Sequence, residues 1–336
     1  MSSPTPLRSL ALPLDCADHP FVSIIVCTVG LRPSLLRCLE SLAAQGCARS
    51  EILVVLNREE NVPLELPALA MPLRVLHEPR RGVCAARNRA IPEARGEILV
   101  FVDDDIVAHS GWLHALLEGF SDPQVACVTG RVIPEGVGYF GAAETNRVYF
   151  GPEALTSRTV APDPGWCEWI LRGHPFIGFG CNMAFRKQFL ERCTPFPEDL
   201  GAGSAIGAAD ENYMFVQILK RGLKVHYTPQ AAVIHVFESD PVGLKARAKQ
   251  IYAANMAFNL KLLAEEKSLR WATLTNLLAG TVRFTRKALG SKSPDLLSTG
   301  DKLGSYWRGV WQYWRAWRAR ASAPTGHPRG SPPQSS

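Results

Sequence analysis

Apolar runs of strand length alternate with helical patterns through the first 130 residues of the chain. The runs predict strands at residues 22–28, 51–56, 73–77 and 98–102. Apolar positions at helical spacing predict helices near residues 33–44 and 84–94. Unbroken Val, Ile and Leu strands between helices are typical of a parallel sheet covered on both faces. We therefore predict an α/β fold, Rossmann-like and mostly parallel, with the carboxyl ends of its strands at one edge.

The pattern weakens after a strand predicted at residues 125–132. From Pro134 to Phe179 the chain is rich in Gly, Pro and aromatic residues, which we interpret as long functional loops. Four side chains in these loops favour packing over disorder: Trp166, Trp169, His174 and Phe176.

Strands and then helices return in the last part of the chain. Strands are predicted at residues 181–185, 224–228 and 232–236. Helices are predicted through Trp112 and Leu116, with Ser110 as N-cap, and at residues 210–221, 241–267, 271–290 and 306–317.

The elements divide the chain into four parts: an N-terminal extension (1–20), an α/β domain (21–240), a helical C-terminal region (241–321) and a disordered tail (322–336). With 336 residues and 46% apolar content, the chain can bury a substantial core. Its nine cysteines form no Cys-x-x-Cys pair and no zinc-type cluster, which favours reduced thiols. We expect no export signal in the first 20 residues and no membrane span, and so a cytoplasmic protein.

Charge changes this picture only near the end of the chain. No acidic residue follows Asp301, while six basic residues do, so the formal net charge of +6 lies there. Such a segment favours acidic membrane surfaces or nucleic acid, although it is often only a solubilising terminus.

Three carboxylates, Asp103-Asp104-Asp105, follow the apolar run at 98–102. Like charges this close repel one another, which a divalent cation relieves. Ligands of open α/β sheets bind beyond the carboxyl ends of the strands, and oxygen ligands suit Mg²⁺ or Mn²⁺ carrying nucleotide phosphates. The triplet therefore predicts a metal site, and the alternative is a solvated acidic turn.

Further motifs stand in order around this triplet. They are Val22-Ser-Ile-Ile-Val-Cys-Thr28, Arg87-Asn88, Gly96-Glu-Ile-Leu-Val-Phe-Val-Asp-Asp-Asp105, Gly207-Ala-Ala-Asp210-Glu211, Gly222 and Val233-Ile-His235. Together they resemble family-2 glycosyltransferases over roughly residues 20 to 240. The resemblance implies a GT-A fold with a nucleotide-binding half (about 21–132), an acceptor half (about 133–240) and, here, a C-terminal helical extension.

The resemblance also implies roles for the acidic residues. Asp103 and Asp105, the outer members of Asp-x-Asp, would contact the sugar and the metal, with Asp105 as the direct ligand. Asp104 faces the other way along the strand and is placed among the donor-binding residues. In the family the second acidic pair reads Glu-Asp, and its second member is the general base. Here the order is inverted to Asp210-Glu211, so the catalytic base is Glu211 or Asp210. The plainer alternative is that both residues only satisfy a helix dipole.

Nucleotide contacts follow from the same resemblance. Thr28 would meet the nucleoside, Arg87 a phosphate, and Asn88 would support that loop. The family has an aspartate for uracil where this chain has Leu56, so either Asn57 or a neighbour such as Glu59 substitutes for it, or else the base differs.

His235 ends a strand, and the resemblance implies that it approaches the metal or the diphosphate, although a histidine among apolar residues is more often a core group. The tryptophans and arginines at 306–317 predict a helix that either lies in a membrane interface or docks on the catalytic domain.

We expect an inverting, metal-dependent glycosyltransferase that uses Mn²⁺ or Mg²⁺ and a nucleotide-sugar, with a UDP-sugar as the first candidate. Its acceptor would be a glycan or a lipid-linked sugar in surface polysaccharide or glycoconjugate synthesis. We expect no nucleic acid partner, and peripheral contact with the inner face of a membrane through the Trp/Arg helix. The alternatives are a nucleotidyltransferase or an inactive nucleotide-binding scaffold.

Overall fold

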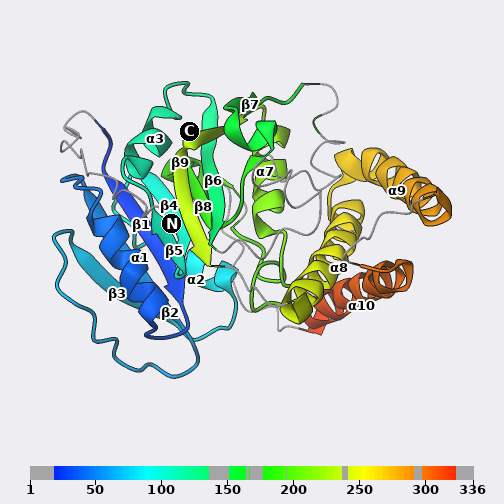
Figure 1. Ribbon diagram of the computed structural model, residues 1–336, viewed down its shortest axis with the longest axis horizontal. Helices are drawn as coiled ribbons and strands as arrows, with labels where there is room; N and C mark the ends of the chain where they lie inside the picture. The colour runs from blue at the N-terminus through cyan, green and yellow to red at the C-terminus, as the bar shows by residue number, and fades with distance from the viewer. Residues whose placement is uncertain are drawn as a thin grey trace, which may run out of the picture.

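A single mixed sheet of nine strands organises the computed structural model (Figure 1). The structure describes residues 19–135, 151–163, 166, 177–193, 195–236, 241–290 and 297–322. The strands are β1 (Val22–Thr28), β2 (Ser50–Asn57), β3 (Leu73–Glu78), β4 (Ile98–Asp103), β5 (Ile106–Ala108), β6 (Val125–Glu135), β7 (Arg158–Val160), β8 (Asn182–Arg186) and β9 (Lys224–Val236). Their order across the sheet is β3-β2-β1-β4-β8-β6-β9-β5, and β7 also pairs with β9.

Most of the long strands run in one direction. β1 to β4 are mutually parallel, and only β8 interrupts them before β6 and β9 continue in the same sense. The register sets Cys27 beside Asp103 and Thr28 beside Leu56. The carboxyl ends of these strands therefore meet at one edge of the sheet, as the unbroken apolar runs predict.

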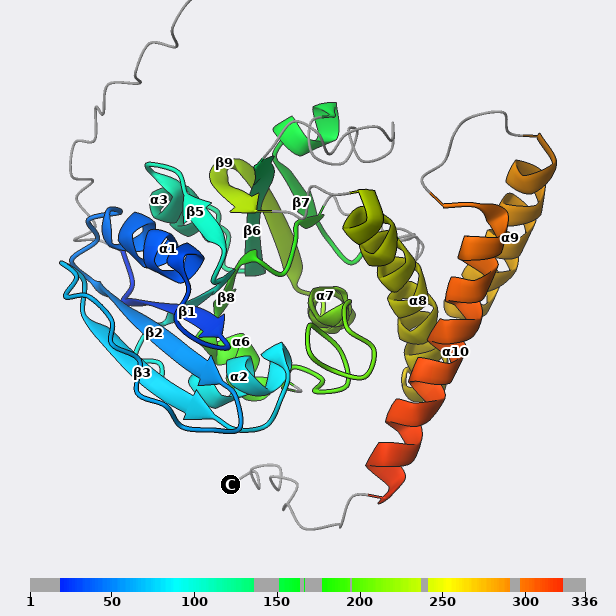
Figure 2. The same cartoon turned by 60° about the horizontal axis from the view of Figure 1, so that its bottom comes forward.

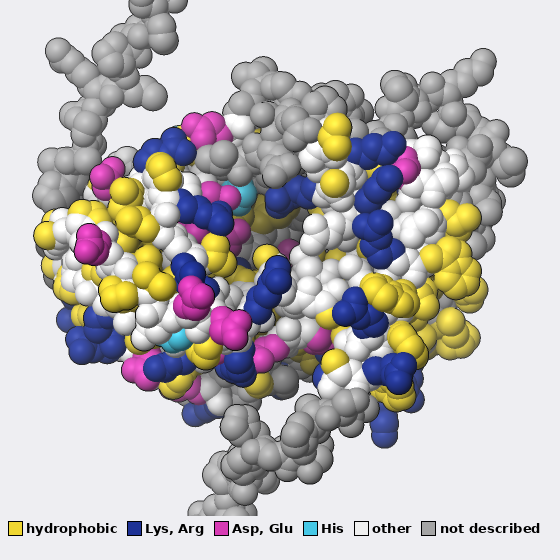
Figure 3. Space-filling model, turned by 90° about the horizontal axis from the view of Figure 1, so that it is seen from below, with side chains coloured by type: hydrophobic (Ala, Val, Ile, Leu, Met, Phe, Trp, Pro, Cys, Tyr) yellow, Lys and Arg dark blue, Asp and Glu magenta, His cyan; other side chains and the backbone are white. Residues whose placement is uncertain are grey.

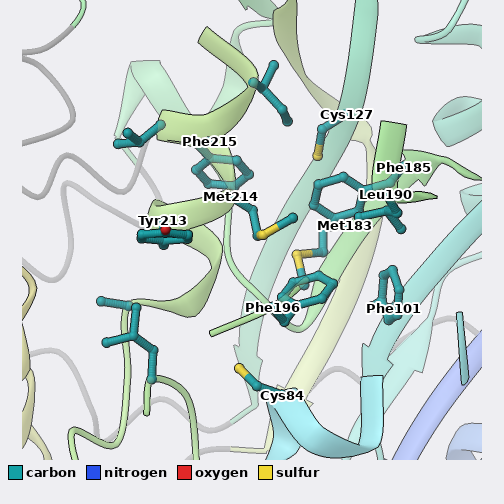
Figure 4. Close-up of a cluster of buried hydrophobic side chains, with 14 of the residues drawn as sticks. Cys84, Phe101, Cys127, Met183, Phe185, Leu190, Phe196, Tyr213, Met214 and Phe215 are labelled. Atoms are coloured by element: carbon teal, nitrogen blue, oxygen red, sulfur yellow. The ribbon is translucent and has the colours of Figure 1, made fainter. Parts of the chain in front are cut away.

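Helices cover both faces of the sheet. α1 (Pro33–Ala43) and α3 (Trp112–Glu118) bury their apolar sides with one face. The other face packs against α2 (Val83–Ala90), α6 (Lys187–Arg192) and α7 (Asp210–Lys220). Figure 4 shows the centre of this second layer, where Phe101, Phe185 and Phe196 meet edge to face with ring centroids 5.3 to 5.9 Å apart.

Two local predictions from the sequence are wrong. The strands predicted at 224–228 and 232–236 are one strand, β9, because β6 follows it through a register shift after Gly130. Ser110 does not cap α3, since the N-cap is Gly111, whose φ of 76° suits a glycine.

Three long helices form a separate layer beside the sheet (Figure 2). They are α8 (Pro241–Glu265), α9 (Arg270–Gly290) and α10 (Thr299–Ser322). A short 3-10 turn at Lys267–Leu269 joins α8 to α9, and another at Pro152–Leu155 precedes β7. α10 lies against α8 so closely that a Cβ on Gly309 would stand 2.3 Å from the Ala253 carbonyl oxygen.

Ion pairs fasten this layer to the sheet domain. Lys261 of α8 lies 3.0 Å from Asp199, and Arg320 of α10 lies 3.4 Å from the same carboxylate. In the described part of the chain, no helix has both the length and the apolar character needed to cross a bilayer.

Several expectations fall outside the described residues, namely the extension up to residue 18, the tail from residue 323, and Trp169, His174 and Phe176. Trp166 is described and packs against the core, as predicted. The seven described cysteines are all free, in agreement with the expected reduced thiols.

Candidate functional site

The acidic triplet lies at the tip of β4, where two other strands bring side chains toward it. Thr28, at the end of β1, donates a hydrogen bond of 2.5 Å to Asp104. On the other side, β5 pairs antiparallel with β9 so that Ile106 stands opposite His235. This pairing carries the histidine to the carboxylates, although 130 residues separate them along the chain.

Asp103, Asp105 and His235 form a compact group of possible metal ligands. His235 Nε2 lies 3.3 Å from Asp105 Oδ1 and 3.7 Å from Asp103 Oδ2. Neighbouring ligands of an octahedral Mg²⁺ or Mn²⁺ stand roughly 3 Å apart, and opposite ones about 4 Å, given bonds of about 2.1 Å. Asp105 Oδ1 is buried and has no hydrogen-bond partner. An ion between these three side chains would satisfy that oxygen, so the residues fit a divalent cation.

The electrostatics of the triplet agree with a cation between its members. Burial and the neighbouring aspartates raise the pKa of Asp104 and of Asp105. Burial acts the same way on Asp103, but His235 and Arg87 outweigh it and hold the pKa of Asp103 below its ordinary value. Burial would lower the pKa of His235, yet Asp103 and Asp105 raise it.

Cys181 is a neighbour that the sequence analysis did not select. Its thiol lies with Asp103 and His235 in a group whose ligand atoms are all within 4.8 Å of one another. Burial and the nearby carboxylates raise its pKa well above the usual thiol value, so it remains a neutral thiol. Because Mg²⁺ and Mn²⁺ prefer oxygen ligands, we assign Cys181 to the wall of the site. Its only signal in the sequence is its place at the start of β8, the strand next to β4.

Arg87 joins the triplet to the second acidic pair. Its buried guanidinium is ion-paired with Asp210, lies 3.7 Å from Asp103 and donates a 3.0 Å hydrogen bond to the Gly180 carbonyl. The side chain is only 4% exposed. Both terminal nitrogens of Arg87 make contacts within the protein, so this cation links the acidic triplet to the second acidic pair.

Asp210 and Glu211 open α7 but differ in surroundings. Asp210 is buried and held by Arg87, whereas Glu211 is half-buried. Burial, together with the charge of Asp210, raises the pKa of Glu211 from 4.5 to about 8. Adjacent helical residues point about 100° apart, so only one of the two can face a given ligand. Glu211 is therefore the carboxylate suited to take up a proton near neutral pH.

The loop before α7 is packed. Ile206 is fully buried, and the Val83 amide donates a 2.9 Å hydrogen bond to the Ala202 carbonyl. Gly201 has a φ of +80°, and a Cβ there would clash with Val83. Ala209 enters α7 with a φ of 71°, the only positive φ of a non-glycine residue in the described ranges. A strained residue directly before the acidic pair is a common feature of functional sites.

The two asparagines support loops. Asn57 donates to the carbonyls of Glu78 and Arg80 and accepts from the Gly82 amide, so its side chain holds the turn before α2. Asn88 exchanges hydrogen bonds of 2.8 and 2.9 Å with the Phe196 backbone. Leu56 is buried, at 2% exposure.

This arrangement, a parallel sheet with an acidic triplet at a strand tip and a second acidic pair facing it, defines the GT-A class of glycosyltransferases. A solved mannosyltransferase from Pyrobaculum calidifontis, in complex with GDP-Man and Mn²⁺, has the same fold. The match has a TM-score of 0.52 at 20% identity and covers 94% of this chain and 90% of that one.

A family model described as "Glycosyl transferase family 2" matches residues 23–193, and the chain belongs to this family. The sequence is 28% identical to the uncharacterized glycosyltransferase EpsJ of Bacillus subtilis, over 54% of this chain and 52% of EpsJ. It is 26% identical to the succinoglycan biosynthesis protein ExoM of Rhizobium meliloti, over 73% of this chain and 76% of ExoM. The chain thus spans about half the length of the first of these relatives. The family and the fold class predicted from the motifs are confirmed.

Proposed function

We propose that the protein is a metal-dependent, inverting glycosyltransferase that moves a sugar from a nucleotide-sugar to a glycan or lipid-linked acceptor in polysaccharide or glycoconjugate synthesis. One observation carries the proposal. Asp103, Asp105 and His235 converge at the sheet edge, and Arg87 links them to the pair that presents Glu211. We keep the division into a donor half (21–132) and an acceptor half (133–240), followed by the helical region (241–321).

Each step of such a transfer has a residue suited to it. When bound by Asp105, Asp103 and His235, Mn²⁺ or Mg²⁺ would neutralise the departing diphosphate. Glu211 would take the proton from the acceptor hydroxyl, and inversion requires that this hydroxyl attacks from the side opposite the nucleotide. Asp210 serves as the buried anchor that fixes α7 through Arg87. Thr28 and Asp104 would form the nucleoside side of the site, with the phosphate contact of Arg87 remaining our prediction.

For the nucleobase of the sugar donor we propose two candidates. UDP is our first candidate from the family resemblance, and the GDP-Man in the Pyrobaculum mannosyltransferase makes GDP the second. The Asn57 amide makes hydrogen bonds with the Glu78 and Arg80 carbonyls and the Gly82 amide, so our proposal does not use it for base recognition.

The test combines binding with turnover. Glu211→Gln should bind the nucleotide with Mn²⁺ as the wild type does, while transfer falls by about 10²- to 10⁴-fold because the proton acceptor is gone. Asp105→Ala should lose the Mn²⁺-dependent part of nucleotide binding in titrations of UDP and GDP with Mn²⁺ or EDTA. Normal turnover by Glu211→Gln would exclude it as the base, and binding insensitive to EDTA would exclude the metal.

We also propose peripheral membrane contact through α10. Its buried face, with Gly309 and Ala316, packs on α8, whereas Trp307, Trp311, Trp314 and Trp317 are 68%, 52%, 47% and 54% exposed. The other expectation, that this helix docks on the catalytic domain, also has support, since the opposite face of α10 packs on α8 and Ala316 joins the core. Arg315 and Arg318 stack on Trp311 and Trp314 at 4.6 and 4.7 Å, a mixture that suits an anionic membrane interface. In Figure 3, apolar and basic side chains mingle over the helical layer at the right.

Vesicle sedimentation tests this contact. The wild type should sediment with vesicles containing phosphatidylglycerol, and a variant with all four tryptophans replaced by Ser should not. Trp271→Ser is the matched control, because Trp271 is 76% exposed but lies on α9, outside the row of four exposed tryptophans on α10 that we call the tryptophan stripe. Equal sedimentation of the four-fold variant and the wild type would contradict the proposal.

A further inference from the structure

A cavity of about 460 Å³ lies between three segments: the loop that leads into α7, the first turns of α8 and the middle of α10. The loop contributes Ser204 and Gly207, α8 contributes Arg247 and Gln250, and α10 contributes Arg308 and Gln312. The cavity therefore forms only where the helical layer meets the sheet domain. The edge with Thr28 and Asp104 is built from other elements.

The cavity is positively charged. Two arginines line it, and no aspartate or glutamate occurs among its described lining residues. The nearby lysines do not change this balance, since Lys245 and Lys249 are paired with Asp301 at 3.0 and 2.6 Å. A polar cavity with two guanidinium groups and no carboxylate is suited to an anion, above all to phosphate, which matches the guanidinium fork.

A second, independent feature points to a hydroxyl on the same ligand. Gln312 Oε1 is buried in the helical layer and has no hydrogen-bond partner. A buried acceptor without a donor costs free energy, which a ligand hydroxyl would recover. Gln250 is already oriented by donating to the Gly207 carbonyl at 3.3 Å. The lining thus offers sites for an anion and for a hydroxyl group side by side.

The cavity also adjoins the proposed catalytic residues. Gly207 is three positions before Asp210, at the start of α7. From α8, Arg247 lies close enough to Asp103 and His235 for its positive charge to act on both. Figure 3 shows a hollow on this face of the molecule with acidic, histidine and basic side chains around it.

We infer that this cavity is the acceptor subsite and that it selects a phosphorylated sugar, with Arg247 and Arg308 binding the phosphate and Gln312 accepting a sugar hydroxyl. This inference rests on the proposed transferase function and names its acceptor class. The phosphate can belong to a free sugar phosphate or to a lipid-linked one. The tryptophan stripe lies on the same helix as Arg308, so a lipid-linked phosphate could reach the cavity from a membrane surface.

Calorimetric titration with defined probes tests the inference. Glucose 1-phosphate should bind the full chain in EDTA, and methyl glucoside should bind at least tenfold more weakly. Arg308→Gln should weaken glucose 1-phosphate binding roughly tenfold, and the double variant with Arg247→Gln further, because each removes charge-assisted hydrogen bonds. Arg315→Gln is the matched control on the same helix, since Arg315 stacks on Trp311 outside the cavity.

The outcomes separate this inference from the proposed function. Unchanged affinity of the folded double variant for glucose 1-phosphate would overturn the subsite, even if Mn²⁺-dependent nucleotide binding persists. Loss of glucose 1-phosphate binding with nucleotide binding intact supports it. Tighter binding of octyl phosphate than of inorganic phosphate, abolished in the double variant, would identify the lipid-linked source. If the wild type binds no nucleotide with Mn²⁺, the transferase proposal fails, whereas the glucose 1-phosphate titration still reports on the cavity.

Discussion

Replacing Arg87 by Met tests whether the site is held together by one buried cation. The guanidinium is 4% exposed and its partner Asp210 is 8% exposed, so neither charge is screened by water. Removing one partner of a buried pair leaves the other charge uncompensated, which costs about 3–5 kcal/mol of the free energy of unfolding. The Gly180 carbonyl also loses its 3.0 Å hydrogen bond. We therefore expect Arg87→Met to lower the free energy of unfolding by an amount in the upper half of this range.

Equilibrium unfolding in guanidinium chloride measures the loss. Tryptophan fluorescence and far-UV circular dichroism must give coincident transitions before a single free energy is assigned. The control is Arg87→Met combined with Asp210→Asn, which removes the unpaired charge. The double variant should recover at least ~2 kcal/mol, because the two residues are directly coupled.

Two results would refute this reasoning. A loss below about 1 kcal/mol in Arg87→Met would mean that Asp210 is solvated. A double variant as unstable as Arg87→Met would place the cost in the other contacts of Arg87, which are Asp103 at 3.7 Å, the Gly180 carbonyl at 3.0 Å and the Phe196 ring at 5.5 Å, and not in the charge pair with Asp210.

Further predictions concern Glu211, the proposed catalytic base, and the packing of α10 on α8. Since burial raises the pKa of Glu211 from 4.5 to about 8, transfer should increase with pH, with an apparent pKa between these values once a bound cation acts on it. The free energy of unfolding should change in the opposite direction, because a carboxyl whose pKa is raised on folding loses its stabilising contribution as pH rises from 4.5 to about 8. The unfolding of Glu211→Gln, measured over the same pH range, should lack that part of the pH dependence. Gly309→Val should destabilise the protein by about 1–3 kcal/mol, because its side chain would meet the Ala253 carbonyl. Gly304→Ala on the same helix has open space and should be neutral or stabilising by ~0.5–1 kcal/mol; equal effects in thermal unfolding would refute the close packing of α8 and α10.

The sheet was predictable because its central strands β1, β2 and β4 are buried on both faces. Residues 98–102 are unbroken apolar residues, and a strand so placed puts Asp103 at its tip whatever the rest of the fold. β9 was harder to predict, since Pro229 interrupts its pattern and a proline removes a ladder hydrogen bond. The structure accommodates Pro229 where the register of β6 and β9 shifts.

The contacts inside the site were less accessible to sequence reasoning. Arg87 and Asp210 are 123 positions apart, so their pairing depends on how α2 and α7 pack on one face of the sheet. Asn57 shows the same limit, since its place at the end of β2 suggests a ligand contact, yet its amide is used by the turn at 78–82. The exposure of the tryptophans on α10 was equally open, because helical spacing alone does not say which face packs.

The inverted acidic pair becomes intelligible once these contacts are known. In the proposed mechanism, Asp210 fixes α7 through a buried ion pair with Arg87, whereas Glu211 exchanges a proton with the acceptor. Arg87 forms its direct ion pair with the first residue of the pair, Asp210, and its charge only partly offsets the burial and the Asp210 charge that raise the pKa of Glu211. Burial without a direct ion pair raises the pKa of Glu211, whereas a carboxylate paired with arginine would resist protonation. In the proposed mechanism the longer side chain of the pair, Glu211, is thus the one that takes the proton, so the inverted order is compatible with an active site.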